Sequence, residues 1–334
     1  MNTIPGAGQM LDRETQHNVI FNSKTKIYFF TAIAIVGLII VGEILSPGFG
    51  SLEGVMSTLA LASVLAIASI GQTLIIISGN GGLDLSVESM ISMGAIMGAL
   101  FSGMEADNML GAILGLVLLG GLVGLLNGVI IHFVKVPPFV LTMAMATVIR
   151  GAVIAYTGGA PSGRTPKLLL ELSTGNMVGP VRWLIVVGII VTIVVQLVLT
   201  RTRFGRGLFL VGTNRSTALV SGVNIGFIIV LTYVIAGICN TLSGFLLLGV
   251  VGSATIAIGD GYTLMTIAAV VIGGTALSGG KGSFFGTLLG AILMIVLSSV
   301  LIAVNISSGM RTMIQGIILA VIITMYTREP KLRQ

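Results

Sequence analysis

Long apolar runs with almost no charge restrict the folds that this sequence can adopt. A helix of roughly 20 apolar residues is long enough to cross a bilayer, and inside the hydrocarbon every backbone polar group must be bonded within the protein. Only 8% of the 334 residues are charged, whereas soluble domains carry about 25%, and the mean hydropathy is +1.10. We therefore expect an all-α, polytopic membrane helix bundle.

Ten runs are candidates for spanning helices. They are residues 27–45, 54–78, 86–102, 109–132, 138–157, 183–200, 226–248, 263–277, 284–304 and 310–326. The third and eighth are short and contain glycine, so they could be broken helices that do not cross fully. Residues 27–328 would form the membrane domain, between a disordered or surface-lying tail (1–26) and a short tail (329–334).

The basic residues are distributed unequally between the two sides that ten spans define. With the N-terminus in the cytoplasm, the outer loops hold only Arg164, Lys167 and Arg182. The inner segments hold Arg13, Lys24, Lys26, Lys135, Arg201, Arg203, Arg206, Arg215, Lys281, Arg328, Lys331 and Arg333. Cytoplasmic loops carry an excess of Lys and Arg, so this bias predicts that both termini are cytoplasmic.

The two halves of the chain show a faint internal similarity. Residues 82–94 can be laid on residues 261–273, and a glycine-rich apolar run follows each. Five spans per half is an odd number, so repeated halves would be inverted in the membrane, as in many transporters. Low-complexity helices align easily, so chance similarity remains the alternative.

Residues 200–224 form a basic polar break in the apolar pattern. Arg201, Arg203, Arg206 and Arg215 lie there without an acid. A helix is predicted over 215–221, after a turn at 212–214. A short helix on the cytosolic face is a surface on which an ATPase could push.

Asp84 and Glu88 are the acids that most need an explanation. Four residues apart, they would share one face of a helix, and an acid within the bilayer is expensive and often functional. They form either a proton or solute-hydroxyl site on a transport path, or a cap in the first turn of a helix. The span order places both near the cytosolic face.

Two further polar residues lie within predicted spans. Arg150 either faces a cavity, donating to solute hydroxyls or to an acid such as Asp260, or extends its charged end to the outer interface, where it has a structural partner. Asn127 either lines the path or joins two helices by a hydrogen bond.

The segment Gly279-Gly280-Lys281 looks like a phosphate-binding loop but lacks its spacing. Thr275 and Gly282 stand where such a loop needs Gly and Ser or Thr. It is either a flexible inner turn or a contact with a partner ATPase. No motif for a metal, cofactor, nucleic acid or catalytic site is present, so we expect no enzyme activity and ATP hydrolysis by a partner.

The chain resembles the permease subunits of bacterial ABC importers for simple sugars. This is the ribose/xylose/galactose group within the branched-chain amino acid and ribose permease family, and the resemblance covers about residues 27–328. The stretches that carry it are 81–87, 137–139 with 150–151 and 156–159, 202–206 with 212–218 and 221–222, and 272–274 with 279–282.

The resemblance implies a type II importer-like fold in the cytoplasmic membrane of a bacterium. A second permease copy or a paralogue would complete the path, a periplasmic or surface sugar-binding protein would deliver the solute, and two ATPase subunits would use ATP and Mg²⁺. Asn214 to Gly222 would be the coupling helix. The residues implied in ATPase coupling are Arg203, Gly205, Arg206, Gly212, Asn214, Arg215, Ala218, Ser221 and Gly222.

The chain departs from its relatives at Glu88, where many have Gly, and at residues 215–217 in the coupling segment. The leading hypothesis is a permease for a monosaccharide or related polyol that works by alternating access, with gates near Asp84 and residues 249–262. A nucleoside, a furanose signal molecule or a branched-chain amino acid are alternative solutes. An ion-coupled secondary transporter that uses Asp84 and Glu88 is the alternative mechanism.

Overall fold

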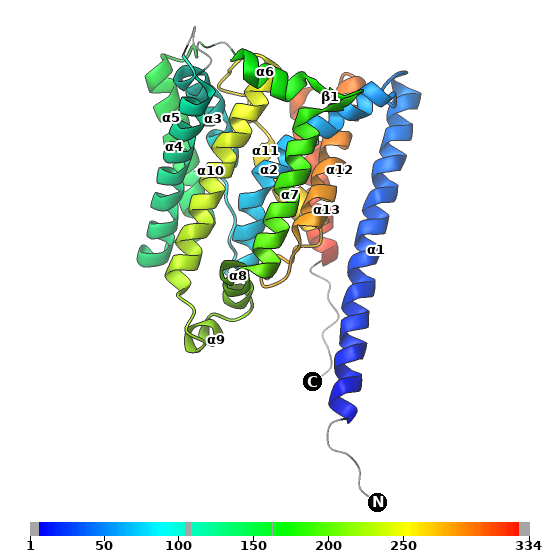
Figure 1. Cartoon of the computed structure of the whole chain (residues 1–334), viewed down its shortest axis with the longest axis vertical. Helices are drawn as coiled ribbons and strands as arrows, with labels where there is room; N and C mark the ends of the chain where they lie inside the picture. The colour runs from blue at the N-terminus through cyan, green and yellow to red at the C-terminus, as the bar shows by residue number, and fades with distance from the viewer. Residues whose placement is uncertain (1–6, 104–107, 162, 164, 327–334) are drawn as a thin grey trace, which may run out of the picture.

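The chain folds into a bundle of helices with a small hairpin at one end (Figure 1). The computed structural model describes residues 7–103, 108–161, 163 and 165–326. The elements are α1 (Ala7–Leu45), α2 (Leu52–Ile77), α3 (Val87–Phe101), α4 (Met109–Val129), η1 (Ile130–Val134), α5 (Pro138–Thr157), α6 (Lys167–Thr174), β1 (Asn176–Val178), β2 (Val181–Arg182), α7 (Trp183–Arg201), α8 (Arg203–Thr213), α9 (Arg215–Val220), α10 (Ile225–Val251), α11 (Tyr262–Ile272), α12 (Phe284–Ala303) and α13 (Ser308–Tyr326). The bundle has an α6 end and, opposite, an α9 end, named after these surface helices.

The predicted membrane bundle is confirmed. Among the described residues, seven helices are long and apolar enough to cross a membrane, namely α1, α2, α4 with η1, α5, α7, α10 and α12, and shorter apolar helices lie in α3, α11 and α13. Each of the ten predicted runs therefore contains one apolar helix. The eighth is shorter than predicted, because Gly273 and Gly274 end α11 at Ile272 and Gly274 has a φ of +84°.

The first helix is longer than predicted. It begins at Ala7, so residues 7–26, which we expected to be a disordered or surface-lying tail, continue the first span as helix. No glycine or proline interrupts residues 9–36, so nothing in the backbone stops the helix where the apolar run begins. In Figure 1, α1 extends beyond the bundle at the α9 end, where α13 also ends.

The two short helices, α3 and α11, are the second halves of broken crossings. Residues 78–86 return from the α9 end as an irregular segment before α3 begins (Figure 1), and residues 252–261 return from the α6 end before α11 begins. The two helices start next to each other, since the Glu88 backbone N–H donates to Thr263 Oγ1 at 3.2 Å. The expectation of broken helices at these two positions is confirmed.

The packing of the two halves follows the inverted pattern. Helix α2 packs on α12 as α10 packs on α4, and α3 packs on α4 and α10 as α11 packs on α12 and α2. The alignment register that the sequence indicated is wrong by four residues. It sets Val87, where α3 begins, opposite Thr266, whereas α11 begins at Tyr262. Both runs are apolar and rich in glycine, so side-chain pattern alone does not fix the register.

Glycines bring the central helices into backbone contact. A Cβ on Gly237 of α10 would lie 2.1 Å from the Gly120 carbonyl oxygen of α4, and one on Gly94 of α3 would lie 2.1 Å from the Thr241 carbonyl oxygen of α10. Apolar side chains gain little from association in lipid, so close backbone approach through small residues is a main source of helix packing there. Close helix packing is therefore the structural role of many of the 47 glycines.

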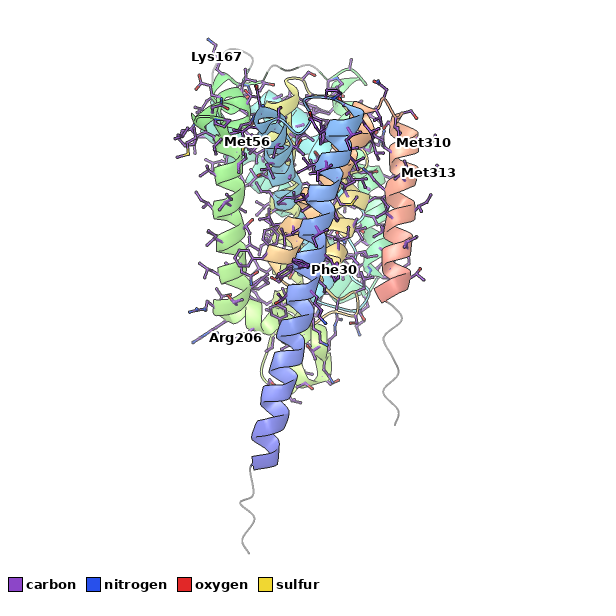
Figure 2. The ribbon with its side chains drawn as sticks, turned by 90° about the vertical axis from the view of Figure 1, so that its right-hand side faces the viewer. Phe30, Met56, Lys167, Arg206, Met310 and Met313 are labelled. Carbon is purple, nitrogen blue, oxygen red and sulfur yellow. The ribbon has the colours of Figure 1, made fainter. Side chains whose placement is uncertain are left out.

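The outer surface of the bundle is apolar. Phe30 on α1 and Met310 and Met313 on α13 point away from the bundle (Figure 2), with exposed fractions of 66%, 50% and 54%. Lys167 and Arg206 mark the two opposite ends in the same view. An apolar surface of this extent is unfavourable in water and fits contact with lipid.

The glycine contacts predict opposite effects for the same substitution at two helical positions. Gly237→Ala should lower stability by about 1–3 kcal/mol, since the added methyl overlaps the α4 backbone. Gly316→Ala, where a Cβ meets nothing within 4 Å, should be neutral or stabilising by up to about 1 kcal/mol. Thermal unfolding of the detergent-solubilised protein measures both, and equal melting temperatures would contradict the packing argument.

Candidate functional site

Asp84 lies in the irregular segment before α3 and is 2% exposed. Its Oδ1 accepts hydrogen bonds from the Ser86 backbone N–H at 2.8 Å and from Ser86 Oγ at 2.6 Å. Its backbone N–H donates to Gln72 Oε1 on α2, and Asn240 Nδ2 on α10 donates to its Oδ2 at 3.5 Å. Asp84 therefore shapes the turn into α3 and connects α2 with α10.

Two expectations for Asp84 are wrong. It does not share a helix face with Glu88, because α3 begins only at Val87. It does not lie at the cytosolic face either, because the segment that carries it enters the bundle, where Asp84 is buried. The spacing rule failed because it assumes a continuous helix through both residues.

Thr142 of α5 satisfies the backbone of the same irregular segment. Its side-chain oxygen accepts from the Leu85 backbone N–H at 3.0 Å and donates to carbonyl oxygens of Leu83 and Pro138 at 3.3 and 3.0 Å. Thr142, Gln72 and Asn240 are functional candidates that the sequence analysis missed. A single threonine or amide in an apolar run gives no signal of a partner far along the chain.

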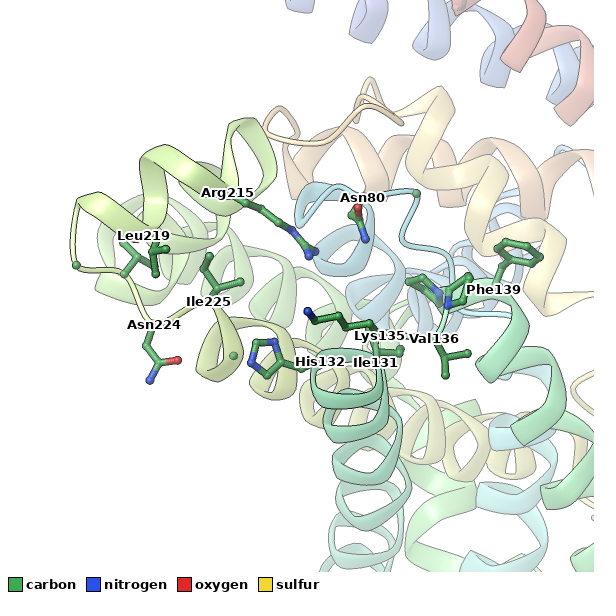
Figure 3. Close-up of a pocket in the computed structure, with 16 residues that line it drawn as sticks. Asn80, Ile131, His132, Lys135, Val136, Phe139, Arg215, Leu219, Asn224 and Ile225 are labelled. Carbon is green, nitrogen blue, oxygen red and sulfur yellow. The ribbon is translucent and has the colours of Figure 1, made fainter.

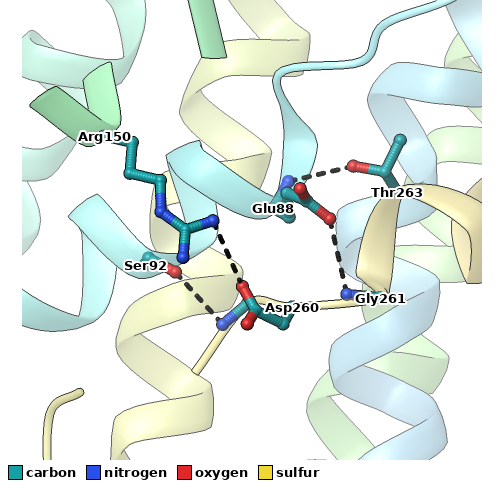
Figure 4. Close-up of polar contacts among 7 residues, drawn as sticks. Glu88, Ser92, Arg150, Asp260, Gly261 and Thr263 are labelled. Carbon is teal, nitrogen blue, oxygen red and sulfur yellow. Dashed lines mark hydrogen bonds and ion pairs between the residues drawn. The ribbon is translucent and has the colours of Figure 1, made fainter. Parts of the chain in front are cut away.

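Glu88 joins the two half-helices at their N-termini (Figure 4). Its Oε2 accepts from the Gly261 backbone N–H at 3.4 Å, next to the bond from its own N–H to Thr263. One turn further along α3, Ser92 Oγ accepts from the Gly259 N–H at 3.1 Å. A carboxylate at two helix N-termini is stabilised by both dipoles, so Glu88 holds together elements that belong to different halves of the chain.

Arg150 and Asp260 form the ion pair that was one of the alternatives for Arg150. Arg150 Nη1 lies 3.8 Å from Asp260 Oδ1, and the two side chains are 49% and 50% exposed. The pair lies over a small cavity that is also lined by Glu88 and Ser92. The cavity volume of about 10 Å³ is near the minimum for one water, so this arrangement is closed to a solute.

Asn127 is 3% exposed on α4, between Gly124 and Gly128, which pack against Tyr233 and Val230 of α10. Its carboxamide oxygen is buried without a hydrogen-bond partner in the described part of the chain. The contact between helices and the lining of a path both remain predictions for this residue.

Residues 200–224 contain two helices, not one. The predicted helix is present as α9, capped by Asn214, whose Oδ1 accepts from the Thr217 N–H. The amphipathic helix α8 was missed, and Gly212, predicted in a turn, lies in its last turn. The glycines of this segment suggested a turn. In the structure they allow close backbone packing instead, Gly205 against Leu199 and Gly212 against Ile77.

Helix α9 lies at the edge of the bundle (Figure 1), and its last two residues form an exposed apolar tip. Leu219 and Val220 are 66% and 86% exposed, whereas Ala218 is fully buried. Of the other residues implied in coupling, Arg203, Arg206, Asn214, Ser221 and Gly222 are exposed. Gly222, with a φ of +76°, turns the chain from α9 towards α10.

Three segments that are far apart in the sequence converge beneath α8. The Gly280 backbone N–H donates to the Ile77 carbonyl oxygen at 2.9 Å. A Cβ on Gly279 would lie 2.5 Å from Gly79 Cα and 2.9 Å from the Gly212 carbonyl oxygen. The 279–281 turn is therefore packed, not flexible as one alternative had it, and only Lys281 extends outwards. The contact joins α8, the end of α2 and the start of the segment that leads to Asp84.

A family model described as the permease component of the branched-chain amino acid transport system matches residues 54–323. The ribose import permease of Escherichia coli K12 is 32% identical over 87% of this chain and 91% of its own length.

Two further relatives are named for other sugars. The D-allose transport system permease of Escherichia coli K12 is 26% identical over 81% of each chain. The galactose/methyl galactoside import permease of Haemophilus influenzae is 30% identical over 79% of this chain and 82% of its own length. No solved structure matches the chain significantly.

The hydrogen bonds of Thr142 predict a measurable loss of stability. Thr142→Val keeps the shape but leaves the Leu85 N–H without its partner, which should destabilise the protein by about 1–3 kcal/mol. Thr312→Val, at an exposed position that bonds only within its own helix, is the matched control. A melting temperature unchanged by Thr142→Val would contradict this interpretation.

Arg150→Gln should lower the free energy of unfolding by less than about 1 kcal/mol, since the ion pair of Arg150 is long and half exposed. The same thermal unfolding measurement checks this value.

Proposed function

Because the chain belongs to the branched-chain amino acid and ribose ABC permease family, in its sugar-import branch, we propose that it translocates a monosaccharide or related polyol. It is the permease component of an ABC transporter and not the enzyme. The relatives named for ribose, allose and galactose favour a sugar over the nucleoside, furanose signal molecule or branched-chain amino acid.

The separation of Asp84 and Glu88 is the observation that supports this mechanism over an ion-coupled one. An ion-coupling pair would have to share one site, whereas Asp84 is enclosed by Ser86, Gln72 and Asn240, and Glu88 contacts the start of α11. Each acid therefore has its own hydrogen-bond partners, and the two do not form one site.

We place the α9 end in the cytoplasm. Lys135, Arg201, Arg203, Arg206, Arg215 and Lys281 lie there, whereas the described basic residues towards the α6 end are Arg150, Lys167, Arg182 and Arg311. Cytoplasmic segments carry the excess of Lys and Arg. Both tails, 1–26 and 329–334, would then extend from the membrane domain 27–328 on the cytoplasmic side.

The proposed stroke starts at α9. A partner ATPase that binds ATP and Mg²⁺ would receive the exposed tip of α9, and its closure would move α8 and α9 together. The backbone contacts of Gly212 and Gly280 with the end of α2 would pass this movement to residues 78–86, and so to the start of α3. There Glu88 links α3 to α11, and separation of Arg150 from Asp260 would open the outer side.

The outer partners follow from the same orientation. A periplasmic or surface sugar-binding protein would dock at the α6 end, where Glu53 and Glu171 are exposed. A second permease copy or a paralogue would complete the path.

The exposed tip of α9 is the place to test ATPase coupling. Val220→Asp changes a side chain that is 86% exposed, so it should leave folding intact while reducing ATPase co-purification and ATP-driven sugar uptake at least about tenfold, because a buried unpaired charge is expensive at an interface. Val178→Asp, 71% exposed on β1 at the other end, is the matched control. Ala218 is unsuitable, since it is fully buried.

The measurement is co-purification in mild detergent from the native host, followed by uptake in liposomes. Loss of the ATPase with Val220→Asp and retention with Val178→Asp would support the proposal. Uptake by this chain alone, without an ATPase, would contradict it.

A further inference from the structure

A large cavity opens at the α9 end, between α9 and the turn that joins η1 to α5 (Figure 3). Its volume is about 980 Å³, which is within the range of small-molecule sites. Three of its lining residues carry basic side chains, namely His132, Lys135 and Arg215, and none of its lining residues is acidic. The mechanism proposed above makes no use of it.

The basic side chains converge on the cavity without an acidic partner. In Figure 3, Lys135 and Arg215 extend into it from opposite walls. Neither forms an ion pair within the described residues, and Arg215 Nε is buried with no hydrogen-bond partner there. Two like charges directed at one space repel each other, and an anion between them would remove that repulsion and supply the missing acceptor.

The backbone around the cavity favours the same charge. The N-termini of α5 and α10 line it through Pro138, Ile225 and Gly226, and helix N-termini attract anions, phosphate in particular. Lys135 has a φ of +61°, a left-handed conformation that residues other than glycine seldom adopt. The chain thus holds a lysine at the cavity wall in an unfavourable backbone conformation.

We propose that this cavity binds a ligand with a phosphate group, held by Arg215 and Lys135, with His132 nearby. The apolar part of the ligand contacts Leu219, Val136 and Phe139. Arg215 belongs to α9 and Lys135 to the turn before α5, so a bound ligand ties these two elements together. Occupancy therefore restrains α9 and slows the transport cycle. A soluble phosphate ester and a phospholipid headgroup share this chemistry.

The test uses the full-length chain in phosphatidylcholine nanodiscs, with glycerol 3-phosphate as the soluble probe. A second set of discs contains phosphatidylglycerol. Binding of the soluble probe is measured by calorimetry, and stabilisation by either source is measured as a shift in melting temperature. Arg215→Gln and Lys135→Gln should each weaken binding about tenfold or more, the loss of one charge-assisted hydrogen bond. Arg201→Gln, an exposed arginine at the same end and outside the cavity, is the control.

The two measurements distinguish a soluble phosphate ester from a phospholipid headgroup as the ligand. Saturable binding of glycerol 3-phosphate identifies a soluble ligand, and stabilisation by phosphatidylglycerol alone identifies a lipid, provided that Arg215→Gln and Lys135→Gln weaken the effect and Arg201→Gln does not. The proposal is overturned if neither source binds, or if all three variants change binding equally. Melting temperatures without ligand show whether each variant is folded.

Discussion

The bilayer interior offers no hydrogen bonds, and this constraint decides where the polar residues of this protein lie. Two irregular segments, 78–86 and 252–261, leave backbone groups that water cannot satisfy. Side chains from other helices fill that role. Thr142 bonds to the first segment, and Glu88 and Ser92 bond to the second. The polar residues therefore gather where helices are broken, which is also where a path for a polar solute is built.

Contacts through glycine connect these segments to the surface helices. Where Gly79, Gly212 and Gly279 meet, backbone lies directly on backbone. A flexible side chain could absorb a displacement by changing rotamer, but such a contact cannot. Packed interiors transmit small shifts for the same reason. Movement of α8 must therefore either move the end of α2 or break this contact. Because the three glycines have no side chains at the contact, movement of α9 and α8 is coupled to the broken crossing formed by residues 78–86 and α3.

The sequence predicted the features that depend on long runs of composition, and it failed where distant residues meet. The apolar runs predicted the spans, and the short third and eighth runs predicted the breaks at α3 and α11. The spacing of Asp84 and Glu88 misled because helix periodicity holds only within a helix. Helix α8 was missed because Gly205 and Gly212 resemble turn residues, although both are placed by contacts with other segments. Thr142 and Gln72 gave no signal, since their partners are backbone groups far along the chain.

The ion pair of Arg150 and Asp260 also bears on what surrounds this chain. Both side chains are about half exposed, yet α5 around them exposes Met143, Val148 and Ile154, an apolar surface of the kind that faces lipid. A charged pair facing hydrocarbon would be strongly disfavoured, and charges at membrane depth are found against protein or water-filled cavities. We therefore expect this face of α5 to be covered by a second permease subunit across a polar path. The pair would then belong to a wall shared by two subunits, which fits the small volume of about 10 Å³ of the cavity that the described residues form beside it.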